Sequence, residues 1–194
     1  MILPIVAYGD PVLKKNGIEI DRDYPGLKEL IGNMFDTMYN AKGVGLAAPQ
    51  VGKSIRLFIV DAIPFADDED EELDKKEVEY LRTFKKVFIN ARMLNEEGEE
   101  WKFNEGCLSI PKIREDVMRP PDIRLVYLDE DFKEHTETFT GMAARIIQHE
   151  YDHIDGKLFT DRISPLRKRL IKGKLADISK GKVQTDYKMR FPLK

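Results

Sequence analysis

The sequence predicts one α+β domain, in which small antiparallel or mixed sheets pack around a central helix, with a further helix near each end of the chain. Two observations predict this class. Short runs rich in β-branched and aromatic residues recur along the chain, as strands require. Three separated segments have helical features instead. We find no internal repeat, and 194 residues suit one hydrophobic core, so residues 1–194 are expected to form a single domain.

The composition is that of a soluble globular protein, with 42% hydrophobic and 35% charged residues. No apolar run approaches the ~18 residues of a membrane span, so we expect no membrane association. The first residues, MILPIVAYGDPVLKK, carry a proline and a charge too early for a signal peptide. A single cysteine excludes an internal disulfide framework. A cytoplasmic location is therefore expected.

The N-terminal half predicts one helix and two strands. Residues 23–40 place apolar side chains close to a helical stripe, with Pro25 in the first turn. The glycine-rich segment 40–53 predicts a loop. IRLFIV (55–60) and KKVFIN (85–90) predict strands.

Between these strands lies an acidic segment, residues 61–80, with ten acidic residues from Asp61 to Glu79. We interpret it as a solvated insertion that joins two strands of a sheet away from any site. An acidic patch that binds a partner is the alternative.

The C-terminal half predicts a hairpin and two helices. RLVYLDED (124–131) and KEHTETFT (133–140) form the hairpin. Thr140 can cap a helix through MAARIIQHEYDHI, and Gly156 suits its end. Ser164-Pro165 begins another helix, which we expect to fray near Gly173 or beyond. From Arg162 onward the chain has eleven Lys/Arg and two Asp. Segment 162–194 is thus a solvated basic helix and tail or, alternatively, an electrostatic contact with RNA.

QHEYDH (148–153) has two histidines four residues apart. On a helix, His149 and His153 share one face and can bind one metal ion. Glu150 lies about 100° round the helix, close enough to reach a metal-bound water without being a ligand. This HExxH pattern is typical of metallohydrolases, in which the metal acidifies water and the glutamate takes its proton.

The third ligand must lie upstream, because the sequence after His153 has neither histidine nor glutamate. Cys107, in NEGCLSIP (104–111), is the best candidate, since a thiolate is a strong ligand and Gly106 lets the backbone come close. The sequence therefore predicts one divalent metal ion held by Cys107, His149, His153 and a water. These ligands alone would favour zinc.

Three segments in this order resemble the signature motifs of the peptide deformylases: GVGLAAPQ (43–50), EGCLS (105–109) and QHEYDHIDG (148–156). The resemblance implies removal of the N-formyl group from nascent polypeptides that begin with formyl-methionine, with release of formate. It also implies Fe(II) as the physiological metal, with nickel, cobalt or zinc able to occupy the site.

The resemblance also assigns roles. Glu150 would act as base and then as acid, while the side-chain amide of Gln50 and the backbone N–H of Leu108 would stabilise the oxyanion. Glu105 and Arg119 match an ion pair that holds the cysteine loop. The positions that match the family's substrate site are Val44, Gly45, Phe103, Gly106, Arg114, Met142, Arg145 and Ile146. Arg145 departs from an apolar lining, so its aliphatic stem or a different orientation must be assumed.

Three alternatives compete with this reading. Another HExxH metallopeptidase would need a downstream ligand, which is missing. A closed structural zinc site would need a fourth protein ligand, and His135 is the only spare histidine. A catalytically inactive homologue that contacts the ribosome is suggested only by the basic C-terminal segment.

Overall fold

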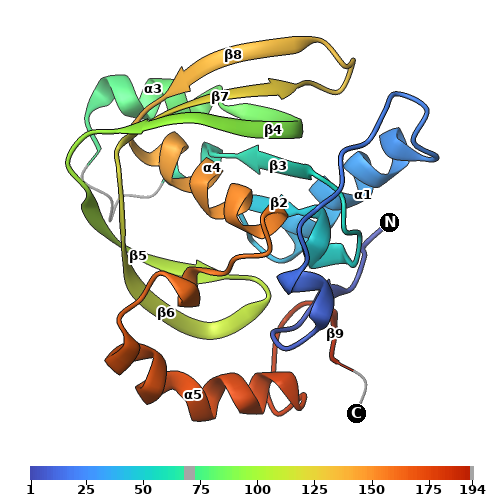
Figure 1. Ribbon diagram of the computed structural model, residues 1–194, viewed down its shortest axis with the longest axis vertical. Coiled ribbons are helices and arrows are strands. Elements are labelled where there is room, and N and C mark those ends of the chain that lie inside the picture. The colour runs from blue at the N-terminus through green and yellow to red at the C-terminus, as the bar shows by residue number, and fades with distance from the viewer. Residues whose placement is uncertain (68–72, 193–194) are drawn as a thin grey trace.

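The computed structural model describes residues 1–67 and 73–192. Its main layer is an antiparallel five-stranded sheet with the strand order β2-β3-β4-β7-β8 (Figure 1). The strands are β2 (Gly45–Ala47), β3 (Leu57–Asp61), β4 (Lys85–Glu97), β7 (Asp122–Leu128) and β8 (Glu134–Phe139). Because β2 lies at one edge, one side of its backbone is not paired within the sheet.

Helices cover both faces of this sheet. Phe58 and Val60 of β3 belong to the core shared with α4 (Gly141–Ile154). The alternate residues Leu57 and Ile59 belong to the core shared with α1 (Leu27–Asn40). Every residue of β3 is therefore buried, which explains why its sequence is a continuous apolar run rather than an alternating one.

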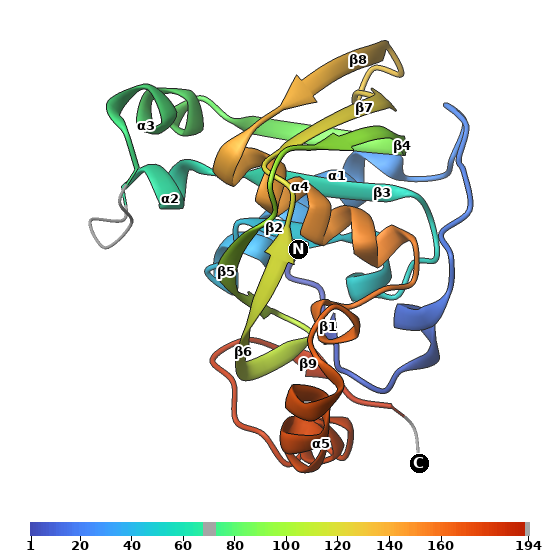
Figure 2. The same ribbon diagram turned by 60° about the vertical axis from the view of Figure 1, so that its left-hand side comes forward.

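A smaller layer lies on the other side of α4. It consists of the hairpin β5 (Trp101–Cys107) and β6 (Ile110–Arg119), with α5 (Pro165–Ser179) packed against it. Figure 2 shows α4 between the main sheet and this hairpin. Beside the turn of the hairpin, the parallel pair β1 (Ile5–Val6) and β9 (Met189–Arg190) joins segments from the two ends of the described chain.

Short helices complete the fold. Two short α-helices, α2 (Ile63–Ala66) and α3 (Lys75–Arg82), lie between β3 and β4. Three 3₁₀ helices are η1 (Pro11–Lys14), η2 (Ala48–Val51) and η3 (Phe159–Asp161). In residues 1–67 and 73–192, no helix combines the length and apolar character that crossing a membrane requires.

The α+β class is confirmed, with a central helix, a helix near each end and small sheets. The predicted strands at 55–60 and 85–90 are β3 and the start of β4, and they pair as neighbours. The predicted hairpin at 124–140 is β7–β8. The C-terminal helix continues through Gly173 to Ser179, with Ser164 as its N-cap.

One predicted helix start was wrong, and the other was right in position but not in its capping hydrogen bond. Helix α1 begins at Leu27, and Gly26 takes the N-cap position with φ 70°, so Pro25 precedes the helix instead of lying in its first turn. Thr140 occupies the N-cap of α4, but its side chain makes no capping hydrogen bond. Instead, the side chain of Glu77 in α3 accepts a hydrogen bond from the backbone N–H of Met142 at 2.8 Å. This N–H in the first turn of α4 has no partner within the helix, so Glu77 supplies one.

The hairpin β5–β6 was missed. Along β6, buried positions alternate with exposed ones, as in a half-buried strand. However, Glu115 and Arg119 occupy two of the buried positions. Because charged residues hold these places, the hydrophobic alternation that marks a strand is absent from the sequence.

The acidic segment does join two neighbouring strands, but it is not separate from the rest of the protein. Glu77 contacts the start of α4, and Phe65 lines a cavity of about 600 Å³ beside α4. The expectation that the segment lies away from the site was therefore wrong for Phe65, whereas Glu77 contacts the start of α4 outside the cavity lining. Residues 68–72 of the segment lie outside the described residues.

We expect Glu77→Ala to lower the free energy of unfolding by about 1 kcal/mol, because it removes the acceptor at the start of α4. The measurement is urea denaturation followed by circular dichroism. Glu79→Ala, an exposed position on the same helix, is the control and should change little. Equal effects of the two substitutions would show that the Glu77 contact does not stabilise α4.

Candidate metal centre

Helix α4 carries two histidines into the interior. Eleven of its 14 residues are buried, and the spacing of four places His149 and His153 on one face. Cys107 reaches this face from the C-terminal end of β5, with Sγ 3.3 Å from Nε2 of His153. The ligand atoms of the three residues all lie within 4.8 Å of one another. The three side chains can therefore hold one metal ion together.

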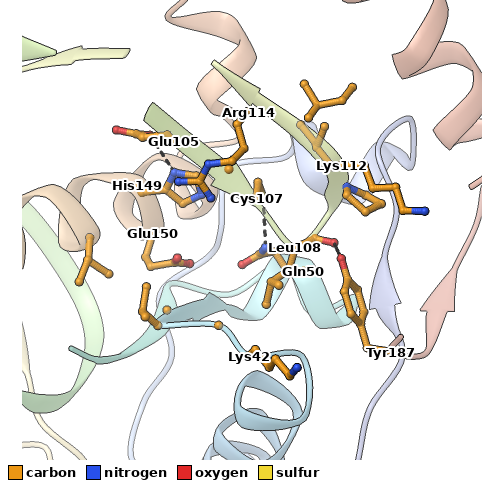
Figure 3. Close-up of a pocket in the computed structure, with 18 of the residues that line it drawn as sticks. Lys42, Gln50, Glu105, Cys107, Leu108, Lys112, Arg114, His149, Glu150 and Tyr187 are labelled. Carbon is orange, nitrogen blue, oxygen red and sulfur yellow. Dashed lines mark hydrogen bonds and ion pairs between the residues drawn. The ribbon is translucent and has the colours of Figure 1, made fainter. Parts of the chain in front are cut away.

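Glu105 fixes the orientation of His149 (Figure 3). Its Oε2 lies 3.0 Å from Nδ1 of His149, so Nδ1 carries a proton and Nε2 is left to bind a metal. Burial lowers the pKa of His149, but hydrogen bonds with Cys107 and Glu105 more than offset this and hold the pKa well above its usual value. Because a metal ion competes with a proton for the same nitrogen, metal loading would release a proton.

A buried ion-pair network holds Glu105 in turn. Arg119, 0% exposed, donates to both carboxylate oxygens of Glu105 at 2.7 and 2.9 Å. It also donates to Asp152 at 2.8 Å, and Asp152 accepts two further hydrogen bonds from Arg162. Burial raises the pKa of Glu105, but the hydrogen bonds from His149 and Arg119 outweigh this and hold it well below its usual range. Glu105 is therefore ionised at neutral pH.

Gln50 presents its amide nitrogen to the ligands. It lies in η2 and is 1% exposed. Its Oε1 accepts from the backbone N–H of Ala47 at 2.8 Å. Its Nε2 lies 3.3 Å from Oγ of Ser109 and 3.5 Å from Sγ of Cys107. The bond to Ala47 sets the orientation of the amide, so a neutral N–H donor faces the candidate ligand Cys107.

Glu150 lies next to the ligands on α4. It is 4% exposed, and its Oε2 has no hydrogen-bond partner among the described residues. Burial raises the pKa of Glu150 to about 7, although the charge of His149 acts in the opposite direction. Gly45 makes room for it, since a Cβ at this position would lie 2.5 Å from Oε1 of Glu150. A carboxyl group of this kind can both accept and return a proton near neutral pH.

A cavity of about 600 Å³ opens onto these groups (Figure 3). Its walls come from β2, η2, α2, β5, β6, α4 and the segment after α5. Apolar side chains line part of it, namely Val44, Phe65, Phe103, Leu108, Ile110, Ile113 and Ile146. Lys42, Lys112 and Arg114 add exposed positive charge. The cavity therefore combines apolar surface with a few polar groups, as ligand sites do.

The structure brings most of the expected substrate residues to this cavity: Val44, Gly45, Phe103, Gly106, Arg114, Arg145 and Ile146 line it. Met142 does not, because it is 2% exposed and belongs to the core between α4 and the main sheet. The guanidinium of Arg145 lies behind the lining, where it donates to Glu105 and to the backbone carbonyls of Val117 and Trp101. The charged end of Arg145 is thus bonded within the protein, which agrees with the expectation that this residue does not present its charge to the substrate pocket.

Several residues of the site were not expected from the sequence. Asp152 and Arg162 extend the ion-pair network. Phe65 and Tyr187 reach the cavity from segments far from the three motifs. Asp152 lies within QHEYDHIDG and next to His153, so its position in the motif was a usable signal. For Phe65 and Tyr187 the sequence held no such signal, since only the folding of distant segments brings them to the cavity.

We expect Arg119→Met to lower the free energy of unfolding by about 3–5 kcal/mol, because it removes the buried cation that bridges the carboxylates of Glu105 and Asp152. The measurement is denaturant unfolding in the presence of chelator, so that metal affinity does not contribute. Arg92→Met is the matched control, since Arg92 pairs with Glu19 at the surface and should matter much less. Similar losses in both variants would contradict a special role for the buried network.

The sequence of this chain is similar to those of known peptide deformylases. Residues 2–169 match the family model described as polypeptide deformylase. The peptide deformylase of Christiangramia forsetii is 66% identical over 192 residues, which are 99% of this chain and 97% of that protein. The peptide deformylase of Flavobacterium johnsoniae is 61% identical over 191 residues, 98% of this chain and 96% of that protein.

Solved structures show the same fold. A peptide deformylase from Legionella pneumophila superimposes with a TM-score of 0.77 at 35% identity, covering 94% of this chain and 98% of that one. The enzyme from Thermotoga maritima gives a TM-score of 0.72 at 36% identity, covering 85% of this chain and 99% of that one. From its sequence, its fold and the assembled Cys/His/His site, this chain belongs to the polypeptide deformylase family of hydrolases.

Proposed function

We propose that this chain removes the N-formyl group from formyl-methionine at the start of nascent polypeptides and releases formate. The observation that carries the proposal is the grouping of Cys107, His149 and His153 within 4.8 Å, with the buried carboxyl group of Glu150 beside them in a cavity of about 600 Å³. Membership of the deformylase family gives the substrate class.

The residues fit one divalent metal ion. A thiolate and two imidazoles are good ligands for zinc, iron, nickel and cobalt, and Glu105 orients His149 for binding. A bound ion would supply Lewis acidity, which acidifies water and polarises a carbonyl oxygen. We propose Fe(II) as the physiological ion, on the basis of family membership. Zinc, nickel or cobalt could occupy the same ligands.

Glu150 carries the proton in the proposed reaction. It takes a proton from the attacking water and later delivers it to the leaving nitrogen of the methionine. Its position supports this role, because it lies beside the ligands but is not one of the three. Its burial supports it too, since a pKa of about 7 lets both protonation states be reached near neutral pH.

Gln50 and Leu108 would stabilise the charge that develops on the formyl oxygen. The amide nitrogen of Gln50 is oriented toward the ligands by its bond to Ala47. Leu108 follows the ligand Cys107 directly, and both line the cavity, so its backbone N–H is available near the same place. A neutral donor suits this task, because it stabilises an oxyanion without protonating the nucleophile.

The substrate backbone would add to the open edge of β2, where Val44 and Gly45 line the cavity. The methionine side chain would lie against Phe103 and Ile146. Gly106 and Arg114 would border the same pocket, together with the stem of Arg145.

The basic segment that includes α5 has an exposed surface that suits binding to RNA. Leu166 and Leu170 of α5 are 66% and 63% exposed, and lysines and arginines surround them in the sequence. We propose that this surface contacts ribosomal RNA in the cytoplasm, where formylated peptides emerge. Sedimentation with ribosomes should show binding that weakens with salt. Arg169→Glu with Lys172→Glu should abolish it, and salt-independent binding would contradict the proposal.

The experiment that tests the function is formate release from a formyl-Met-Ala-Ser peptide. Protein purified anaerobically and loaded with Fe(II) should release formate rapidly, and chelator should abolish the release until metal is restored. The same peptide without the formyl group is the blank. Metal bound at one ion per chain without formate release would reject the proposal in favour of a structural site or an inactive homologue. Cleavage of the peptide bonds instead would indicate another metallopeptidase.

We expect Glu150→Gln to keep its metal but to lose turnover by about 10²–10⁴-fold, because the amide cannot accept the proton. Metal content is measured by mass spectrometry and kcat by formate release. Loss of the metal in parallel with activity would show that Glu150 acts as a ligand or holds the ligands in place.

A further inference from the structure

The segment after α5 forms part of the cavity wall. Gln184, Thr185, Asp186 and Tyr187 all line the cavity that opens onto the metal ligands. Figure 3 shows the ring of Tyr187 directed toward Leu108. The match to the family model ends at residue 169, so this wall is formed by residues beyond the matched region.

The wall is fixed in place by the N-terminal strand. Strand β9 pairs in parallel with β1, with Ile5 N–H donating to Lys188 O and Ala7 N–H to Arg190 O, both at 2.9 Å. The next residue, Tyr8, donates its backbone N–H to the carbonyl of Ser109 at 2.8 Å. The N-terminal strand therefore connects the C-terminal segment to the turn between β5 and β6.

Tyr187 closes this connection at Leu108. Its hydroxyl donates to the carbonyl oxygen of Leu108 at 2.8 Å. Burial raises the pKa of Tyr187, and the nearby Cys107 raises it further, so the hydroxyl stays protonated and remains a donor. Leu108 and Ser109 form the turn between the two strands, where no ladder pairing fixes the backbone.

This turn is where the reaction needs accurate placement. Cys107 is a metal ligand, and the backbone N–H of Leu108 is the proposed oxyanion donor. A rotation of the turn by a small amount would move this N–H relative to the ligands. Tyr187 and Tyr8 hold the carbonyls of Leu108 and Ser109, respectively, so they limit that rotation from two sides.

We infer that Tyr187 is a positioning residue for the reaction. Through its hydrogen bond to the carbonyl of Leu108, it holds the backbone so that the N–H of Leu108 is directed at the substrate. The C-terminal segment then contributes to catalysis by orienting this donor. The inference rests on the proposed function, because Leu108 matters only if it stabilises the oxyanion. A hydroxyl that merely filled space would affect folding or metal binding and leave the rate of each metal-loaded molecule unchanged.

The test is Tyr187→Phe, which removes the hydroxyl and keeps the ring. We expect kcat per bound metal to fall about tenfold, less than the 10²–10³-fold typical of losing an oxyanion donor itself. The KM for formyl-Met-Ala-Ser should stay within about twofold, because ground-state binding loses no contact. Metal content and the melting temperature should be unchanged. Tyr24→Phe is the matched control and should leave kcat unchanged, since this half-buried tyrosine does not line the cavity and its hydroxyl makes no hydrogen bond within the described residues.

A kcat per bound metal equal to that of the unmodified protein would overturn the inference, whether or not metal is lost. If Tyr187→Phe does not fold, 4-fluorophenylalanine at this position replaces it, since fluorine keeps a similar size and cannot donate a hydrogen bond, and full activity there would also overturn the inference. Absence of formate release from the unmodified, metal-loaded protein would instead reject the proposed function, so the two failures are distinguishable.

Discussion

The site depends on the buried carboxylate of Glu105. It lies on β5, yet it accepts hydrogen bonds from Arg119 of β6 and from Arg145 and His149 of α4. The candidate metal ligands are divided between the same two parts of the fold, Cys107 on the hairpin and the histidines on the helix. One ionised side chain therefore fixes the helix against the hairpin and orients His149 as well.

Two equally buried glutamates behave in opposite ways because their partners differ. Glu105 and Glu150 are each 4% exposed. Hydrogen bonds from His149 and Arg119 hold the pKa of Glu105 low, whereas burial without a hydrogen-bond partner for Oε2 among the described residues raises that of Glu150 to about 7. The first carboxylate can serve as a fixed charge and the second as a proton carrier. Environment, rather than residue type, separates the two roles.

The cavity is built from parts with little structure of their own. The open edge of β2, the turn at Leu108 and the segment 184–187 meet there. Each is short, and each is held by contacts with a more rigid element: Gly45 by its fit against Glu150 on α4, and Tyr187 through β9 and the N-terminal strand. Precise placement of reacting groups thus comes from rigid neighbours rather than from the loops themselves.

The sequence by itself determined the fold class, the helix that carries His149 and His153, and Cys107 as the third candidate ligand. Such features follow from local spacing and from residue types with few alternative uses. Only the tertiary structure decided that β6 is a strand, that Met142 lies in the core and that Tyr187 reaches the cavity. The reason is physical. Glu115 and Arg119 can occupy inward positions of β6 because partners outside that strand neutralise their charges. Contacts between residues so far apart in the sequence produce no local sequence pattern from which they could be predicted.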